Sequence, residues 1–388
     1  MIFLEKKVWP PILAAVIIGW ALRLFFTIET PIGSDSVSGK LSSYNDELAH
    51  THYTEYVIEH SKLPAQVEAI TDSNALAKGR YEYYQPPLYY VLHAGLLTFL
   101  NEIGPKMIPL SGRLMNVLLS LGLLFAFYLM ARELSLSSVE TAAGLIFLAL
   151  SGVLVRFQSI DSNDALFWLL SAGIFCSTAR LSNHSAKAGG WFCFVLFATL
   201  ALYTKLSALI LLPLPLLLVF MRRGPRIIFY WTLSILLIVL LTLPVWLRNL
   251  SDFGSLIPLE AGFGTAGWRA PGLFSFAFAL RSLIFPWTEF WQGMLGSFFI
   301  MIPLAVFIFA KAARQPQNGD NDAVIHFGLV LSLIAFLSLN TRYDQAESRY
   351  LFAAWPSLAL MVSRSTGSVS GLWILIAVLL IPFLLFLL

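Results

Sequence analysis

The chain has little charge and almost no cysteine. Of its 388 residues, 12% are Asp, Glu, Lys or Arg, and two are cysteines, Cys176 and Cys193. Both cysteines lie inside apolar runs, which excludes a disulfide framework and a CxxC metal site. The formal net charge of +3 is small and is scattered over the segments between the apolar runs. This charge pattern argues against a nucleic-acid-binding surface.

Hydrophobic residues, in contrast, make up 58% of the chain. Apolar runs recur along its whole length, and a helix needs roughly 20 such residues to cross a bilayer. We therefore predict an all-α, polytopic membrane protein with about eleven spans. Residues 1–388 should form a single transmembrane domain, with no soluble C-terminal domain. The predicted spans are 8–27, 108–131, 140–157, 163–181, 190–204, 206–221, 226–246, 290–311, 324–340, 349–364 and 370–388.

The topology depends on residues 86–103, a short apolar stretch that opens with a Pro pair. If this stretch spanned the membrane, the basic cluster 221–226 would lie outside, against the positive-inside tendency. We therefore predict an interfacial or re-entrant helix here, and one large external loop over residues 28–107. The acidic and unusual polar residues then share the non-cytoplasmic face of a cytoplasmic (inner) membrane, facing the periplasm or the cell exterior.

The first external loop contains an amphipathic pattern from Tyr44 to His60, typical of a helix on the membrane surface. Asp46 and Glu47 precede His50 by four and three residues, so each shares a helix face with His50. The group could hold a proton or a metal ion. It could equally be part of a solvated, charged helix surface.

A second acidic site is the turn SIDSND, which contains Asp161 and Asp164 close to the predicted bilayer. Acids at this depth are costly unless they are paired or have a function, although Asp164 could simply cap the next helix. Cations lie at the same predicted depth. They could extend toward lipid headgroups, or they could bind a phosphate. These cations are Arg113, Lys205, Arg248 and Arg349.

Together these motifs resemble the C-type (GT-C) membrane glycosyltransferases, which include protein O-mannosyltransferases and the lipid A aminoarabinose transferase. The likeness covers most of the chain, and it is greatest to a poorly characterised bacterial branch. It rests on the order and spacing of Asp46-Glu47 with His50, YEYYQPPLYY at 81–90, Arg113, the turn 161–164, Tyr203-Thr204-Lys205, Trp246-Leu247-Arg248-Asn249 and ESRYLF at 347–352.

The resemblance implies an inverting transfer of a hexosyl or pentosyl unit from a polyprenyl-phosphate donor to an acceptor hydroxyl. The acceptor would be a glycan, a lipid or a protein. Asp46 is our candidate base, because a hydroxyl must lose its proton as it attacks the anomeric carbon. Glu47 would orient the acceptor or raise the pKa of Asp46.

The leaving phosphate needs charge stabilisation, for which Lys205, Arg248 and Arg349 are candidates and Arg113 a weaker one. His50, Asp161 and Asp164 could instead hold a divalent cation such as Mg²⁺ or Mn²⁺ at the same phosphate. No other cofactor is implied. In the aromatic segment, Tyr84 and Tyr89 could form a wall of the sugar pocket or serve only as interfacial anchors.

The main alternative is a transporter or flippase for a lipid-linked sugar, which would also need many spans and buried charges. Transporters typically contain two pseudo-repeated halves, and we find no internal repeat here. A structural scaffold for envelope assembly would not explain the acids at the ends of the spans.

Overall fold

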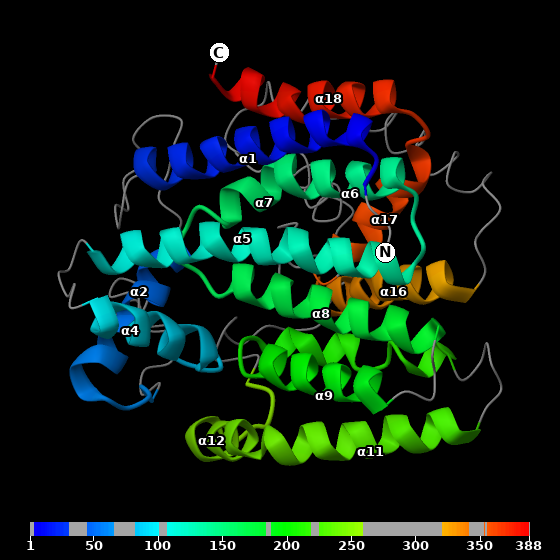
Figure 1. Cartoon of the computed structure of the whole chain (residues 1–388). Coiled ribbons are helices and arrows are strands. Elements are labelled where there is room, and N and C mark those ends of the chain that lie inside the picture. Colours follow the sequence, from blue (N-terminus) through cyan, green and yellow to red (C-terminus); the bar gives the residue numbers. More distant parts are fainter. Residues whose placement is uncertain are drawn as a thin grey trace.

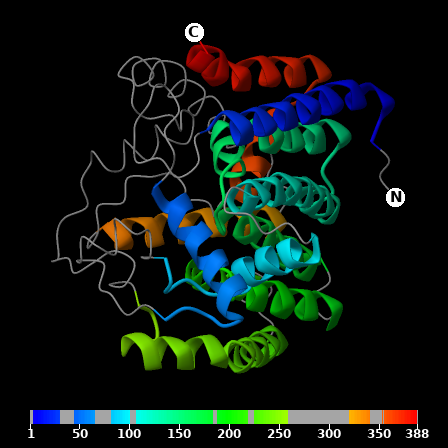
Figure 2. The same cartoon turned by 90° about the vertical axis from the view of Figure 1, so that its left-hand side faces the viewer.

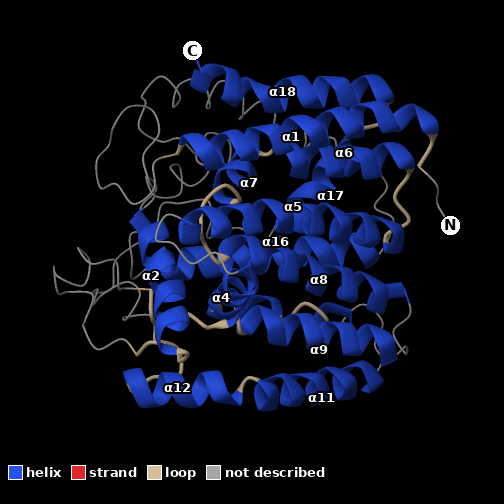
Figure 3. Ribbon diagram, turned by 60° about the vertical axis from the view of Figure 1, so that its left-hand side comes forward, coloured by secondary structure: helices blue, strands red, loops and turns tan. Residues whose placement is uncertain are grey.

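The computed structural model describes residues 4–30, 45–65, 82–100, 107–183, 188–218, 225–258, 320–340, 353 and 355–387. Within these ranges every regular element is a helix (Figure 3). The all-α class predicted from the sequence is therefore confirmed.

The helices occur in the following order along the chain. They are η1 (Lys6–Val8), α1 (Trp9–Glu29), α2 (Asn45–His60), α4 (Leu88–Leu100), α5 (Met107–Glu133), α6 (Ser138–Leu150), α7 (Gly152–Phe157), α8 (Asp164–Asn183), α9 (Ala188–Leu202), η2 (Leu206–Leu211), α11 (Pro225–Leu241), α12 (Leu243–Phe253), α16 (Asp320–Asn340), α17 (Trp355–Ser365) and α18 (Val369–Leu387).

Three of the described helices are long and apolar enough to cross a membrane, namely Lys6–Glu29, Met107–Glu133 and Asp164–Ser182. The pair Arg226–Leu241 and Leu243–Phe253, bent by 53°, would be a fourth. Shorter apolar helices account for most of the other predicted spans. The predicted span 290–311 lies outside the described residues, and the total of about eleven stays a prediction.

One predicted span, 140–157, is broken at Ser151 into α6 and α7. The guanidinium of Arg23 on α1 donates hydrogen bonds to the carbonyls of Leu148 and Ala149, at 3.3 and 2.7 Å. Gly19 permits this approach, since a Cβ there would lie 2.3 Å from the Ala149 oxygen. A buried arginine thus satisfies carbonyls that the end of a helix leaves without partners.

The predicted span 206–221 is also irregular, because it begins as the 3₁₀ helix η2 and continues in turns. Pro213 and Pro215 lack the N–H that a regular helix requires. Their carbonyls accept short-range bonds from Leu216 and Leu218 instead, at 2.9 and 3.1 Å.

The helices form a bundle in which α1, α5, α8, α9 and α11 are successive neighbours (Figure 1). At one end of this bundle α2 and α4 pack against each other, and Figure 2 turns this end toward the viewer. We call it the site end, and it comprises α2, residues 82–100, the turn 158–163, Lys205 and α12. The described parts of the predicted external loops therefore meet at one end of the bundle.

Helix α4 lies at the site end and does not run through the bundle. Its 13 described residues span about 20 Å. The N–H of Leu88 donates to the carbonyl of Tyr203, and His93 contacts Ser111 near the start of α5. That residues 86–103 do not span the membrane stays a prediction.

Candidate active site

A buried ion pair connects α2 to α5 at the site end. Arg113 donates from Nε to Oε1 of Glu47 and from Nη2 to Oε2, each at 2.6 Å, and both side chains are buried. Its Nη1 donates to the carbonyls of Thr27 and Thr30, both at 2.8 Å. The pair therefore fixes the first turn of α2 against the end of α1 and the start of α5.

This pairing bears on the two roles that we predicted from the sequence. The positive charge of Arg113 is compensated by Glu47, and among the described residues four hydrogen bonds of its guanidinium go to Glu47 and to two backbone carbonyls. The geometry therefore favours a positioning role for both residues over contact with a substrate phosphate or acceptor. Sequence alone could not reveal the pair, because its members lie 66 residues apart.

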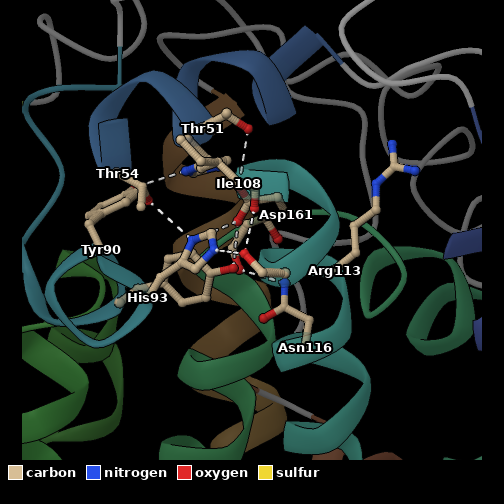
Figure 4. A network of polar contacts seen from close by, with 12 residues as sticks. Thr51, Thr54, Tyr90, His93, Ile108, Arg113, Asn116 and Asp161 are labelled. Carbon is tan, nitrogen blue, oxygen red and sulfur yellow. Dashed lines mark hydrogen bonds and ion pairs between the residues drawn. The ribbon is translucent and has the colours of Figure 1, made fainter. Parts of the chain in front are cut away.

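Asp161 lies at the centre of the network in Figure 4, in the turn between α7 and α8. Its backbone N–H donates to Oε1 of Glu47 at 2.8 Å, and the hydroxyl of Tyr89 donates to its Oδ1 at 2.6 Å. Its side chain is fully buried, and this burial raises the pKa of Asp161 to about 8. Asp161 therefore holds its proton to a higher pH than an exposed aspartate does.

The hydrogen bonds around Thr51 agree with a protonated Asp161. The Thr51 hydroxyl lies 3.0 Å from the Glu47 carbonyl oxygen and 3.1 Å from Oδ2 of Asp161. A hydroxyl has one proton to donate, and a carbonyl oxygen can only accept. If Asp161 carries its proton on Oδ2, it donates to Thr51, which donates to Glu47, and both bonds are made.

His93 on α4 extends this network, although no sequence motif singled it out. Its Nε2 lies 2.7 Å from the hydroxyl of Ser111, which donates its own proton to the Ile108 carbonyl at 2.8 Å. Ser111 must therefore accept from Nε2–H, which leaves Nδ1 to accept from Thr54 at 3.2 Å. Burial lowers the pKa of His93 to about 4, so the ring is neutral. The only signal in the sequence is a basic side chain within an apolar segment.

His50 belongs to an aromatic contact between α2 and α4. Its Nδ1 lies 2.7 Å from the hydroxyl of Tyr90, and the ring of Tyr90 stacks on Tyr53 with centroids 3.7 Å apart. Over the residues that the structure describes, no group of three or more His, Cys, Asp or Glu side chains is arranged to hold a metal ion. His50, Asp161 and Asp164 are thus not brought together as one ligand set.

A second polar cluster surrounds Lys205, which follows α9 and is the N-cap residue of η2. Its ammonium lies 2.5 Å from Oδ1 of Asp164, and its side chain is 18% exposed. Next to it, Asn163 donates to the carbonyl of Thr204 at 3.1 Å. Asp164 is therefore an ion-pair partner, beyond the capping role that its place at the start of α8 suggested. Lys205 is more accessible than Arg113 and Arg248, whose side chains are 0% and 13% exposed.

Arg248 on α12 holds the turn that precedes α4. It donates to the carbonyls of Gln85 and Pro64 at 3.1 and 3.0 Å, and to that of Tyr83 at 2.5 Å. The half-buried Tyr84 in this turn accepts a hydrogen bond from the Gln85 amide at 2.9 Å. In this arrangement Arg248 binds backbone carbonyls.

Two predicted site residues cannot be placed in this network. Asp46 is the second residue of α2, but its side chain lies outside the described residues. Arg349 lies entirely outside them. Both assignments stay predictions.

No family model matches the chain, and no curated protein matches it. Its fold is similar to that of ArnT from Cupriavidus metallidurans bound to undecaprenyl phosphate, with 13% identity and a TM-score of 0.59 over 91% of this chain. The apo state of ArnT gives 12% identity and a TM-score of 0.60, again over 91% of this chain. The oligosaccharyltransferase of Archaeoglobus fulgidus in complex with Zn and sulfate gives 12% and 0.54 over 96%.

The chain spans 59%, 58% and 52% of these three structures, respectively. ArnT and the oligosaccharyltransferase are GT-C glycosyltransferases, and the predicted GT-C fold is confirmed.

Proposed function

We propose that this chain is a membrane glycosyltransferase that moves a sugar from a polyprenyl-phosphate donor to an acceptor hydroxyl. The observation that carries the proposal is the convergence of ionisable side chains from α2, α5, the turn 158–163, α8 and Lys205 at one end of an apolar bundle. The fold is similar to that of a protein solved with undecaprenyl phosphate, and this likeness supports the same function.

Asp46 is the proposed general base. Its neighbour Glu47 is fixed by Arg113 and by the backbone N–H of Asp161, so the helical turn that carries Asp46 has a defined position. A general base must lie within hydrogen-bond reach of the proton it removes, and a fixed backbone supports such placement. Glu47 then acts as a positioning residue. The sequence had suggested that it would orient the acceptor.

Lys205 is the proposed phosphate ligand. The leaving phosphate carries negative charge, and a preformed cation lowers the energy of the transition state without reorganisation. Lys205 combines partial exposure with a fixed partner, Asp164, at the same end of the bundle. Arg349 is a second candidate for the same role.

The proposal places the reaction at the non-cytoplasmic face of the inner membrane. An inverting transfer of a hexosyl or pentosyl unit to a glycan, lipid or protein acceptor would occur there. Tyr84, in the turn 82–87, would border the sugar, whereas Tyr89 supports Asp161 through its hydroxyl.

A deletion strain tests the function against the transporter alternative. Loss of a transferase should leave polyprenyl-phosphate sugar on the outer leaflet of the membrane, and the wild-type chain should remove it on complementation. Accumulation on the cytoplasmic leaflet would indicate a flippase and would contradict the proposal.

A further inference from the structure

Helix α12 presents three different faces at the site end. Its buried face carries Val245 and Asn249, which are 3% and 1% exposed. The other two faces differ in chemistry and in exposure. One is apolar, with Leu243, Leu247 and Leu250, and the other is polar, with Arg248, Ser251 and Asp252.

The apolar face is open to a large extent, since Leu243, Leu247 and Leu250 are 41%, 56% and 50% exposed. These positions are three or four residues apart and form one stripe along the helix. A helix wholly in water would not gain from exposing such a stripe. A helix wholly in hydrocarbon would not expose Ser251 and Asp252.

The apolar stripe continues a larger exposed surface on α11. There Leu233, Leu236 and Leu240 are 52%, 62% and 64% exposed, as expected for a helix that faces lipid. The chain bends by 53° between α11 and α12. The axis of α12, at the end of the bundle, therefore points in a different direction from that of the lipid-facing α11.

The polar side of α12 is tied to the site end through Arg248. Its guanidinium holds three carbonyls, those of Pro64, Tyr83 and Gln85, and its Nε lies 3.6 Å from Asp252. At its C-terminus, Gly254 closes the helix in the left-handed conformation with φ of 65°. The same helix thus contacts the turn that leads into α4 and offers an apolar stripe on its outside.

From these contacts we infer that α12 is a membrane-surface helix that lies at the boundary between headgroups and acyl chains and anchors the turn 82–87 to that boundary. The apolar face of α12 then contacts the lipid bilayer. Amphipathic helices with one strongly apolar and one polar face bind at this depth. The bilayer surface then sets the height of the site end relative to the lipid, whatever reaction takes place there.

Spin labels on the full chain test the membrane contact directly. Single cysteines at Leu247, Leu250, Ser251 and Asp252 would be introduced after replacing Cys176 and Cys193 by Ala, with Leu236→Cys as the lipid-facing control. In phosphatidylcholine vesicles, labels at 247 and 250 should collide more often with molecular oxygen than with a water-soluble nickel chelate. Labels at 251 and 252 should show the reverse preference.

Two results would overturn the inference. If the label at 247 met the nickel chelate as often as the label at 252, the apolar stripe would lie in water. If neither reagent reached 247 and 250, a protein surface such as a second copy would cover the stripe instead.

Amide hydrogen exchange tests the anchoring of the turn. Arg248→Met should speed exchange severalfold in a peptide covering residues 82–90, while Arg132→Met, at the other end of the bundle, should leave it unchanged. Unchanged exchange in Arg248→Met protein would refute the anchor. Because neither experiment uses transfer activity, each can fail independently of the proposed function.

Discussion

Removing one charge of the ion pair between Glu47 and Arg113 should lower the free energy of unfolding by an unusually large amount. Glu47→Gln keeps the shape and the acceptor oxygen for Asp161, but it leaves the guanidinium of Arg113 buried without a counter-charge. Removing one partner of such a pair typically costs about 3–5 kcal/mol. Arg113→Met should cost a similar amount because it leaves the carboxylate buried.

The double variant Glu47→Gln, Arg113→Met removes both charges, and it should cost far less than the sum of the single variants. The assay is unfolding by sodium dodecyl sulfate in mixed micelles, followed by circular dichroism, with a double-mutant cycle to extract the coupling. A control pair lies at the opposite end of the bundle. There Arg364 and Glu140, 2.9 Å apart, have side chains that are 11% and 18% exposed.

Glu140→Gln should cost less than Glu47→Gln, because this pair is only partly buried and water can reach the charge that remains. An equal cost for Glu47→Gln and Glu140→Gln, together with additive effects at Glu47 and Arg113, would contradict a buried, coupled pair. That outcome would mean that water reaches the pair.

Three further predictions concern the same network. Burial raises the pKa of Asp161 from 3.8 to about 8, so between these pH values the folded state keeps a proton that the unfolded state loses. The free energy of unfolding should therefore fall as pH rises from about 4 to about 8, by up to ~1.4 kcal/mol per pH unit. Asp161→Asn should remove this slope in unfolding curves, and an equal slope in the variant would contradict the assignment. Gly112→Ala should reduce transfer activity strongly, since a Cβ at Gly112 would lie 2.2 Å from Oδ1 of Asp161, whereas Gly122→Ala meets only a flexible side chain at 3.0 Å and should retain activity. Ser111→Ala should cost about 1–3 kcal/mol of unfolding free energy by leaving Nε2–H of His93 unpaired, and a cost near zero would indicate that another acceptor replaces the hydroxyl.

The sequence predicted the helices well because a bilayer imposes a length and an apolar composition on each span. The irregularities were missed for a physical reason. The break at Ser151 depends on Arg23, which is more than a hundred residues away, and on the absence of a side chain at Gly19. Hydropathy carries no information about such pairings.

The candidate site was predicted in part. Those acids and cations at the ends of spans that the structure describes meet at one end of the bundle, as the placement of the loops suggested. Their partners could not be deduced, because charge and spacing alone do not say that Arg113 binds Glu47 and Arg248 binds backbone carbonyls. His93 was missed because a lone histidine in an apolar segment has no characteristic spacing.

The central claim is that the site end transfers a sugar from a polyprenyl phosphate with Asp46 as the base. The most direct measurement is sugar transfer by the purified chain in proteoliposomes, with a radiolabelled polyprenyl-phosphate sugar and envelope extract as acceptor. The matched variants are Asp46→Asn and Glu59→Gln, two carboxylates of the same helix, of which Glu59 is exposed. We predict transfer by the wild type and by Glu59→Gln, and at least a hundredfold loss in Asp46→Asn with unchanged folding. Full transfer by Asp46→Asn would contradict the assignment of the base, and no transfer by the wild type would contradict the proposed function.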